Sequence, residues 1–201
     1  MNRKTLLLIT VVAEGGLFLL GLLLLAGSDR GLWARFDLSW IATAYAISLC
    51  VPMFVALYLV ARSRWEPLSR LGREIDEKIT PIFTRCKIID LALIAFFAGV
   101  GEELFFRGWM QAVLVERSGV VLGILITSAI FGLLHYLSMA YAIYAFITGI
   151  YLGLIYQVSG NLYIVMAIHA IYDFVALLYL FKKGKTRETG ESNSGTAQQV
   201  E

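Results

Sequence analysis

Histidine, cysteine and proline are scarce in this sequence, and charge of either sign is sparse. The 201 residues include two histidines, two cysteines and three prolines, and only 16% are charged. Cys50 and Cys86 have neither the spacing of a metal motif nor the setting of a disulfide framework, so we assign them no chemistry. The net charge is only +2, and the basic residues stand beside apolar runs. This pattern gives no indication of a nucleic-acid partner.

Long apolar runs dominate what is present. Hydrophobic residues make up 59% of the chain and the mean hydropathy is +0.74, which is too apolar for a soluble domain of ordinary composition. About 20 residues are needed for one helical span of a bilayer. We therefore predict an all-α, polytopic membrane helix bundle in a single domain, residues 1–181. Its six predicted spans cover about residues 6–26, 38–61, 88–115, 122–137, 139–156 and 162–181.

The polar segment 62–87 separates the second span from the third. It is rich in arginine and lysine, so the positive-inside rule places it in the cytoplasm. Apolar residues recur at helical spacing between its charges, which predicts an amphipathic helix on the membrane surface, ended by Pro81. A connector helix that packs on the protein and contacts no lipid headgroup is an equal alternative. The apolar positions are Trp65, Leu68, Leu71, Ile75 and Ile79.

Both ends of the chain carry basic residues next to a predicted span. Arg3 and Lys4 precede the first span, and Lys182 opens a basic and polar tail over residues 182–201. Both termini are therefore predicted to be cytoplasmic, in agreement with an even number of spans. The tail is rich in Gly, Ser, Thr and Gln, so we expect it to be disordered.

Three charged residues stand inside the third predicted span: Glu102, Glu103 and Arg107. Charges within a bilayer are costly and are usually functional. On a helix, Glu103 and Arg107 are four residues apart and can neutralise each other. Glu102 points about 100° away, so it lacks this counter-charge and its burial suits it to the work of a general base. A buried structural charge network is the alternative reading.

Glu14 lies near the middle of the first predicted span. It is either an indirect partner of the same site, or a structural carboxyl that is protonated or hydrogen-bonded to a neighbouring helix. The sequence favours the structural reading.

The two histidines both lie within apolar segments. His135 follows Phe131 by four residues, and His169 precedes Asp173 by four. The pair His169 and Asp173 can therefore share one helix face and a hydrogen bond, which would orient the ring. Polar groups on three separate helices must avoid lipid, so we expect them to converge in the bundle interior.

These three motifs, Glu-Glu-x-x-x-Arg, Phe-x-x-x-His and His-x-x-x-Asp on successive hydrophobic segments, resemble those of the CPBP (ABI) family of intramembrane proteases. That family includes type 2 CAAX prenyl endopeptidases and proteins linked to bacteriocin processing or self-immunity. The resemblance covers about residues 99–176, within the predicted motif-bearing core 88–181. It implies a membrane-anchored substrate, prenylated or bacteriocin-related, and a place in the bacterial plasma membrane.

The resemblance also implies roles for the residues of the motifs. Glu102 would activate the attacking water, and Glu103 would pair with Arg107. His135 and His169 would line the water and oxyanion site together with Asp173. This aspartate replaces the asparagine of the eukaryotic prenyl proteases, and an ionised aspartate only accepts hydrogen bonds. It could therefore orient His169 but could not donate to an oxyanion.

Two other functions remain open at this stage. Glu102, His135 and His169 could hold Zn²⁺ with an open position for water, although no closely spaced pair of ligands is present. We favour a glutamate mechanism without a cofactor. The other alternative is a non-catalytic membrane protein, such as an immunity factor or scaffold.

A count of residues along the predicted spans raises one difficulty. It puts His135 near the cytoplasmic edge of the bilayer and Glu102 deeper. For the two to meet, the third helix must tilt or break, or the fourth must start lower than predicted.

Overall fold

The structure is a computed structural model that describes residues 2–27 and 36–197, and within these ranges every regular element is helical. The predicted all-α fold is therefore confirmed. In chain order the elements are α1 (Arg3–Ala26), α2 (Trp40–Leu49), α3 (Val51–Arg62), α4 (Glu66–Lys78), α5 (Thr80–Phe83), α6 (Ile88–Glu103), the π-helix η2 (Leu104–Gln111), α7 (Ala112–Ser118), α8 (Val120–Leu134), α9 (Met139–Ser159) and α10 (Leu162–Ala197).

Four helical segments of the described chain are long and apolar enough to cross a membrane, which makes this an integral membrane protein. They are Arg3–Ala26, Trp40–Arg62, Met139–Ser159 and Leu162–Arg187. The other two predicted spans differ from them. The third is the continuous run of α6, η2 and α7, which carries charges, and α8 has only 15 residues.

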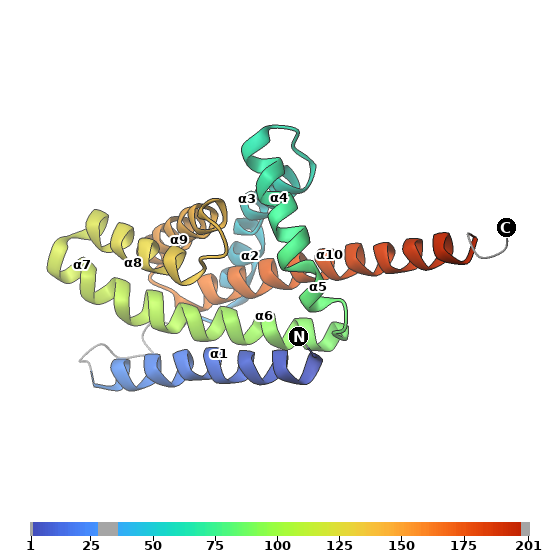
Figure 1. Cartoon of the computed structure of the whole chain (residues 1–201). Helices are drawn as coiled ribbons and strands as arrows, with labels where there is room; N and C mark the ends of the chain where they lie inside the picture. Colours follow the sequence, from blue (N-terminus) through green and yellow to red (C-terminus); the bar gives the residue numbers. More distant parts are fainter. Residues whose placement is uncertain (1, 28–35, 198–201) are drawn as a thin grey trace.

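α6 lies between α1 and α10, and two glycines allow this close packing (Figure 1). A Cβ atom on Gly99 would come within 2.7 Å of the backbone nitrogen of Ala170 in α10. One on Gly101 would come within 2.6 Å of the backbone oxygen of Glu14 in α1. Real Cβ contacts are never so short, so both positions require glycine. The two glycines lie three residues and one residue before Glu102, so they bring α1 and α10 close to the backbone of α6 beside this glutamate.

The short α8 removes the difficulty over the depth of His135. α7 and α8 form a hairpin that turns at Gly119. Glu102 precedes this turn by about as many residues as His135 follows it, so antiparallel helices bring the two to one level. The predicted fourth span, 122–137, was wrong at its end, because α8 stops at Leu134 and His135 is its C-cap.

The amphipathic helix of the polar segment is α4, which crosses α10 in Figure 1. Its Leu71 is buried on the protein, whereas Trp65 at its start is exposed. Pro81 does not end this helix as predicted. α4 stops at Lys78, and Pro81 lies in the first turn of α5, where a proline lacks no helical hydrogen bond.

α10 runs past the sixth predicted span. Residues 182–197, where the sequence predicts a disordered tail, continue this helix, and residues 198–201 lie outside the described chain. Contacts with the polar segment explain the extension. Lys183 and Arg187 both form ion pairs with Asp76 of α4.

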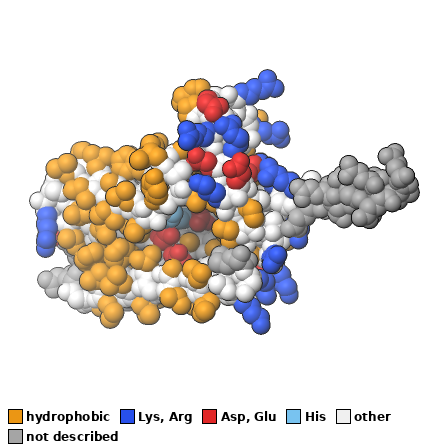
Figure 2. Space-filling model, in the orientation of Figure 1, with side chains coloured by type: hydrophobic (Ala, Val, Ile, Leu, Met, Phe, Trp, Pro, Cys, Tyr) orange, Lys and Arg blue, Asp and Glu red, His pale blue; other side chains and the backbone are white. Residues whose placement is uncertain are grey.

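The surface divides by charge (Figure 2). Lysine and arginine side chains gather over α4 and at the end of the molecule where α1 begins, whereas apolar side chains cover most of the remaining face. A recess near the middle of this face holds acidic and histidine side chains. The recess is where the candidate site lies.

Candidate active site

Four helical elements supply the polar side chains of the site. α6 carries Glu102 and Glu103, η2 carries Arg107, His135 ends α8, and α10 carries His169 and Asp173. The structure brings all of these predicted residues together. Since the bilayer offers no partner to a charge, this convergence satisfies groups that would otherwise face lipid.

The pair of Glu103 and Arg107 forms the buried base of the site. Nη1 of Arg107 donates to Oε1 of Glu103 at 2.7 Å, and both side chains are 0% exposed. Nη2 of Arg107 donates to the backbone oxygen of Gly149 at 3.0 Å, which links η2 to α9. The predicted pairing is therefore present, although Arg107 lies on a π-helix and not on an α-helix. π-Helical turns often occur at functional sites.

His169 contacts Glu103 more closely than it contacts Asp173. Its Nδ1 lies 2.8 Å from Oε1 of Glu103, and its Nε2 lies 3.5 Å from Oδ2 of Asp173. Because a carboxylate oxygen accepts, Nδ1 must carry the proton. Glu103 thus fixes the tautomer of His169, a contact that the sequence did not suggest because 66 residues separate the two.

Glu102 lies between the two histidines. Its Oε1 is 3.6 Å from Nε2 of His135, and its Oε2 is 3.9 Å from Nε2 of His169. The Glu102 side chain is 8% exposed, and its Oε2 has no hydrogen-bond partner within the described residues. Both distances are longer than a good hydrogen bond, and a water beside either pair can reach both of its groups at ordinary hydrogen-bond distance.

Phe131 holds His135 by its backbone and by its ring. Nδ1 of His135 lies 2.9 Å from the backbone oxygen of Phe131, so Nδ1 donates and Nε2 is the atom that faces Glu102. The two rings stack with centroids 4.3 Å apart. The Phe131 ring also lies 4.9 Å from the guanidinium carbon of Arg107 and packs edge-on to His169. It therefore contacts three polar members of the site.

Asp173 connects the site to a cavity of about 390 Å³. The cavity is lined by residues of α1, α3, α4, α5, α9 and α10, and its lining is largely apolar. Two of its tyrosines, Tyr144 and Tyr172, share a hydrogen bond of 2.6 Å between their hydroxyls. Asp173 is 30% exposed whereas His169 is 7% exposed. The aspartate is thus the polar group at which the cavity meets the buried part of the site.

Two further polar side chains lie near the site: Gln111, to which the sequence analysis gave no role, and Glu14, for which it left two readings open. Gln111 donates from its side chain to the backbone oxygen of Gly153, a second link from η2 to α9. Glu14 of α1 packs behind Gly101 and is close enough to interact electrostatically with Glu102 and His169. Its Oε2 is buried without a hydrogen-bond partner among the described residues.

Zinc is the alternative occupant of this site, with three side chains as its candidate ligands. Glu102, His135 and His169 do approach one another, but within residues 2–27 and 36–197 no group of three His, Cys, Asp or Glu side chains has the arrangement that would hold a metal ion. A tetrahedral site would need ligand atoms that converge at about 2.0–2.2 Å from one point. The described residues therefore show no zinc site as they stand.

Comparison with known proteins gives the family. Residues 84–175 match the family described as type II CAAX prenyl endopeptidase Rce1-like. A Bacillus subtilis (strain 168) protein, named "Uncharacterized protein YpbD", is 33% identical over 136 residues, which are 65% of this chain and 65% of that protein. The chain thus spans slightly less than two thirds of that relative's length. No solved structure is significantly similar to this chain. The matched residues include all three motifs of the site, so this part of the chain is an Rce1-like (CPBP) family domain.

Proposed function

We propose that this protein is an intramembrane endopeptidase that hydrolyses a peptide bond of a membrane-anchored substrate, with Glu102 as the base that activates water. The observation that carries the proposal is the position of the Glu102 carboxylate between Nε2 atoms of His135 and His169. The match of residues 84–175 to a family of prenyl endopeptidases supports the same reaction class.

The first step forms a bond between water and the substrate carbonyl. Water bound between Glu102 and His135 gives a proton to Glu102 while its oxygen attacks the carbonyl carbon. Nε2 of His135 is the accepting nitrogen of a neutral ring, since Nδ1 donates to Phe131. His135 therefore orients the water by accepting a hydrogen bond from its other O–H group. The family resemblance placed both histidines along the water and oxyanion site, and this proposal gives His135 the water.

The second step needs a donor for the tetrahedral oxyanion. Nδ1 of His169 is occupied by Glu103, so only a protonated His169 can donate from Nε2. The carboxylates of Glu103 and Asp173 flank this ring and would stabilise its positive charge. Glu102 then passes the proton it took from water to the amine as the C–N bond breaks. Water is consumed, and two peptide products leave.

The substrate is proposed to enter through the cavity beside Asp173. Its apolar lining suits a peptide with apolar side chains, and α4 forms one wall of it. We further propose six membrane crossings with both termini cytoplasmic, in a bacterial plasma membrane. The crossings are the four long spans, the run of α6 to α7, and α8. Tags that proved accessible on opposite sides of the membrane would refute this topology.

Isotope labelling tests the proposed reaction. The purified protein in lipid vesicles is given a set of membrane-anchored peptides in H₂¹⁸O, and the products are weighed by mass spectrometry. The proposal predicts one new peptide carboxylate that carries ¹⁸O, and no product with His135→Ala. If no anchored peptide is cleaved while the protein is folded, a non-catalytic scaffold or immunity protein becomes the better description.

A further inference from the structure

α4 forms one wall of the cavity that leads to the site, although it lies outside the predicted spans. Ile75 of α4 and Ile79, the C-cap of α4, line this cavity together with Asp173 of α10. Leu71, one turn earlier on the same face, is 3% exposed. The apolar face of α4 is therefore packed on the protein and next to the site, which leaves its polar side chains free to make contacts around the cavity.

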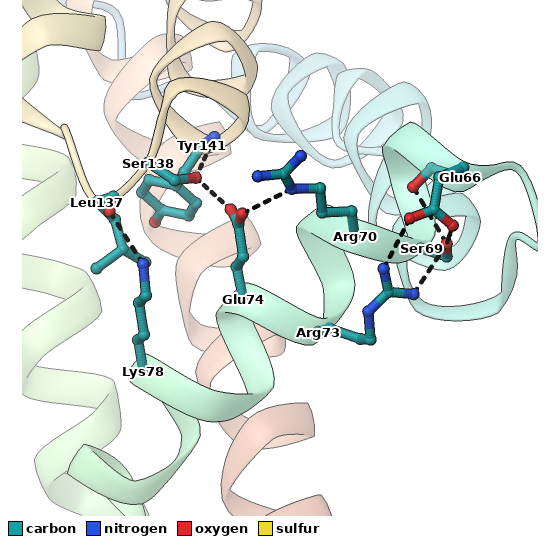
Figure 3. Close-up of polar contacts among 9 residues, drawn as sticks. All are labelled: Glu66, Ser69, Arg70, Arg73, Glu74, Lys78, Leu137, Ser138 and Tyr141. Atoms are coloured by element: carbon teal, nitrogen blue, oxygen red, sulfur yellow. Dashed lines mark hydrogen bonds and ion pairs between the residues drawn. The ribbon is translucent and has the colours of Figure 1, made fainter.

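Two of these polar side chains fasten the loop between α8 and α9 (Figure 3). Oε2 of Glu74 accepts a hydrogen bond from the hydroxyl of Ser138, and Nζ of Lys78 donates to the backbone oxygen of Leu137 at 3.4 Å. Arg70 approaches Glu74 from the other side, with Nε 3.2 Å from Oε1. We call the contacts of Glu74 and Lys78 with this loop the α4 clamp.

The loop that the clamp holds begins with His135. Only Tyr136 separates His135 from Leu137, and Ser138 caps α9 by accepting from the backbone nitrogen of Tyr141 at 3.2 Å. The ring of His135 is held through Phe131, and the His135 side chain is 30% exposed. A displacement of Ser138 would therefore be passed along a very short segment to the ring that faces Glu102.

The charge of Glu74 strengthens its hydrogen bond with Ser138. The hydrogen bond from Ser138 and the nearby Arg70 hold the pKa of Glu74 below its ordinary value. The carboxylate is thus ionised at neutral pH, and a hydrogen bond to an ionised acceptor is stronger than one between neutral groups. Glu74 is also only 16% exposed, so water competes poorly for it.

We propose that Glu74 is a positioning residue, which acts through Ser138 to hold His135 in line with Glu102. This inference rests on the proposed function for its effect on catalysis, but its effect on His135 can be measured without any substrate. By this contact a helix outside the membrane spans controls the geometry of a site within them.

The first test measures the reactivity of His135 directly. Diethyl pyrocarbonate acylates accessible histidine nitrogens, and mass spectrometry of peptides separates the chain's two histidines. We expect Glu74→Ala to be modified at His135 several-fold faster than wild type, with the buried His169 as an internal reference. Glu66→Ala is the matched control, because Glu66 also lies on α4 and pairs with an arginine, Arg73, but does not contact the loop.

Equal rates at His135 in wild type and Glu74→Ala would overturn the inference, even if the protein proves to be a protease. If Glu74→Ala does not fold, Ser138→Asp takes its place. That variant keeps an acceptor for the cap of α9 but repels Glu74. Adding Glu74→Gln to Ser138→Asp restores a donor and should return the His135 rate towards wild type. A failure of this rescue would contradict the inference.

A second readout applies once a cleaved substrate is known. Misplacement of a catalytic group by about 1 Å can cost ~10²-fold in rate, so Glu74→Ala should lower kcat by up to this factor and leave KM nearly unchanged. Glu66→Ala should change neither. A rise in KM with an unchanged kcat would mean that α4 acts on substrate entry and does not position His135.

Discussion

His169 is held by Glu103, and not mainly by the aspartate four residues after it. Nδ1 of His169 and Nη1 of Arg107 both contact the same oxygen, Oε1 of Glu103, at 2.8 and 2.7 Å. One carboxylate thereby ties α6 to both η2 and α10 in the bundle interior. Glu103 is thus the structural centre of the site, whereas Glu102 has no such partner.

Replacing Glu103 should therefore damage the fold more than replacing Glu102. Glu103→Gln leaves Arg107 buried without its counter-charge, and breaking a buried pair costs about 3–5 kcal/mol. Glu102→Gln removes no hydrogen bond from the described structure. Thermal unfolding in detergent should show a clearly lower midpoint for Glu103→Gln. Equal midpoints for the two variants would contradict the assignment.

The parts of the fold that follow local rules could be predicted from the sequence. The apolar runs predicted the helices, and Glu103 with Arg107 predicted an ion pair from spacing alone. The ends of helices could not be predicted where tertiary packing determines them. α8 ends at Leu134, where the chain turns towards α4 and α9. α10 extends to Ala197, and its Lys183 forms an ion pair with Asp76 of α4.

Contacts between distant segments were the main omission. Nothing local joins Glu103 to His169 or Glu74 to Ser138. The scarcity of polar residues in the spans was the available signal, since each buried charge must find a partner somewhere in the bundle. That signal predicted that Glu102, His135 and His169 would meet, but not which atoms would be in contact.

Asp173→Asn should be a mild change. Asparagine keeps a carbonyl oxygen near Nε2 of His169, where Oδ2 of Asp173 lies at 3.5 Å, and Glu103 keeps hold of Nδ1. We expect a loss of about tenfold in kcat, the low end for residues that orient a catalytic group. Asp173→Ala, which leaves no acceptor, should be slower still. A loss for Asp173→Asn as severe as that for Glu102→Gln would give Asp173 a direct role in the chemistry.

Chelation separates the glutamate mechanism from the zinc alternative. Under the glutamate mechanism, incubation with EDTA followed by its removal should leave the rate of peptide cleavage unchanged. Activity that is lost to the chelator and restored by Zn²⁺ would instead assign Glu102, His135 and His169 as ligands. Elemental analysis of the purified protein provides an independent check.

The contact of Glu74 with Ser138 should depend on pH. The folded protein holds the pKa of Glu74 below its ordinary value, so the ionised carboxylate stabilises the fold above that ordinary value, near 4.3. This contribution is lost as the pH falls through the lower, folded-state pKa. The difference in thermal midpoint between wild type and Glu74→Gln should thus shrink below pH ~4. A difference that grew on acidification would contradict the assigned contact.

The rate of cleavage by Glu102→Gln tests the central claim most directly. Glutamine is nearly the same size as glutamate but cannot take a proton from water, so the fold should persist while the base is lost. Removal of one oxyanion donor costs about 10²–10³ in rate, and we expect the loss in kcat for Glu102→Gln to be at least as large. Both proteins would be measured on one membrane-anchored peptide, with thermal midpoints to establish equal folding. Cleavage by folded Glu102→Gln at the wild-type rate would show that Glu102 is not the base.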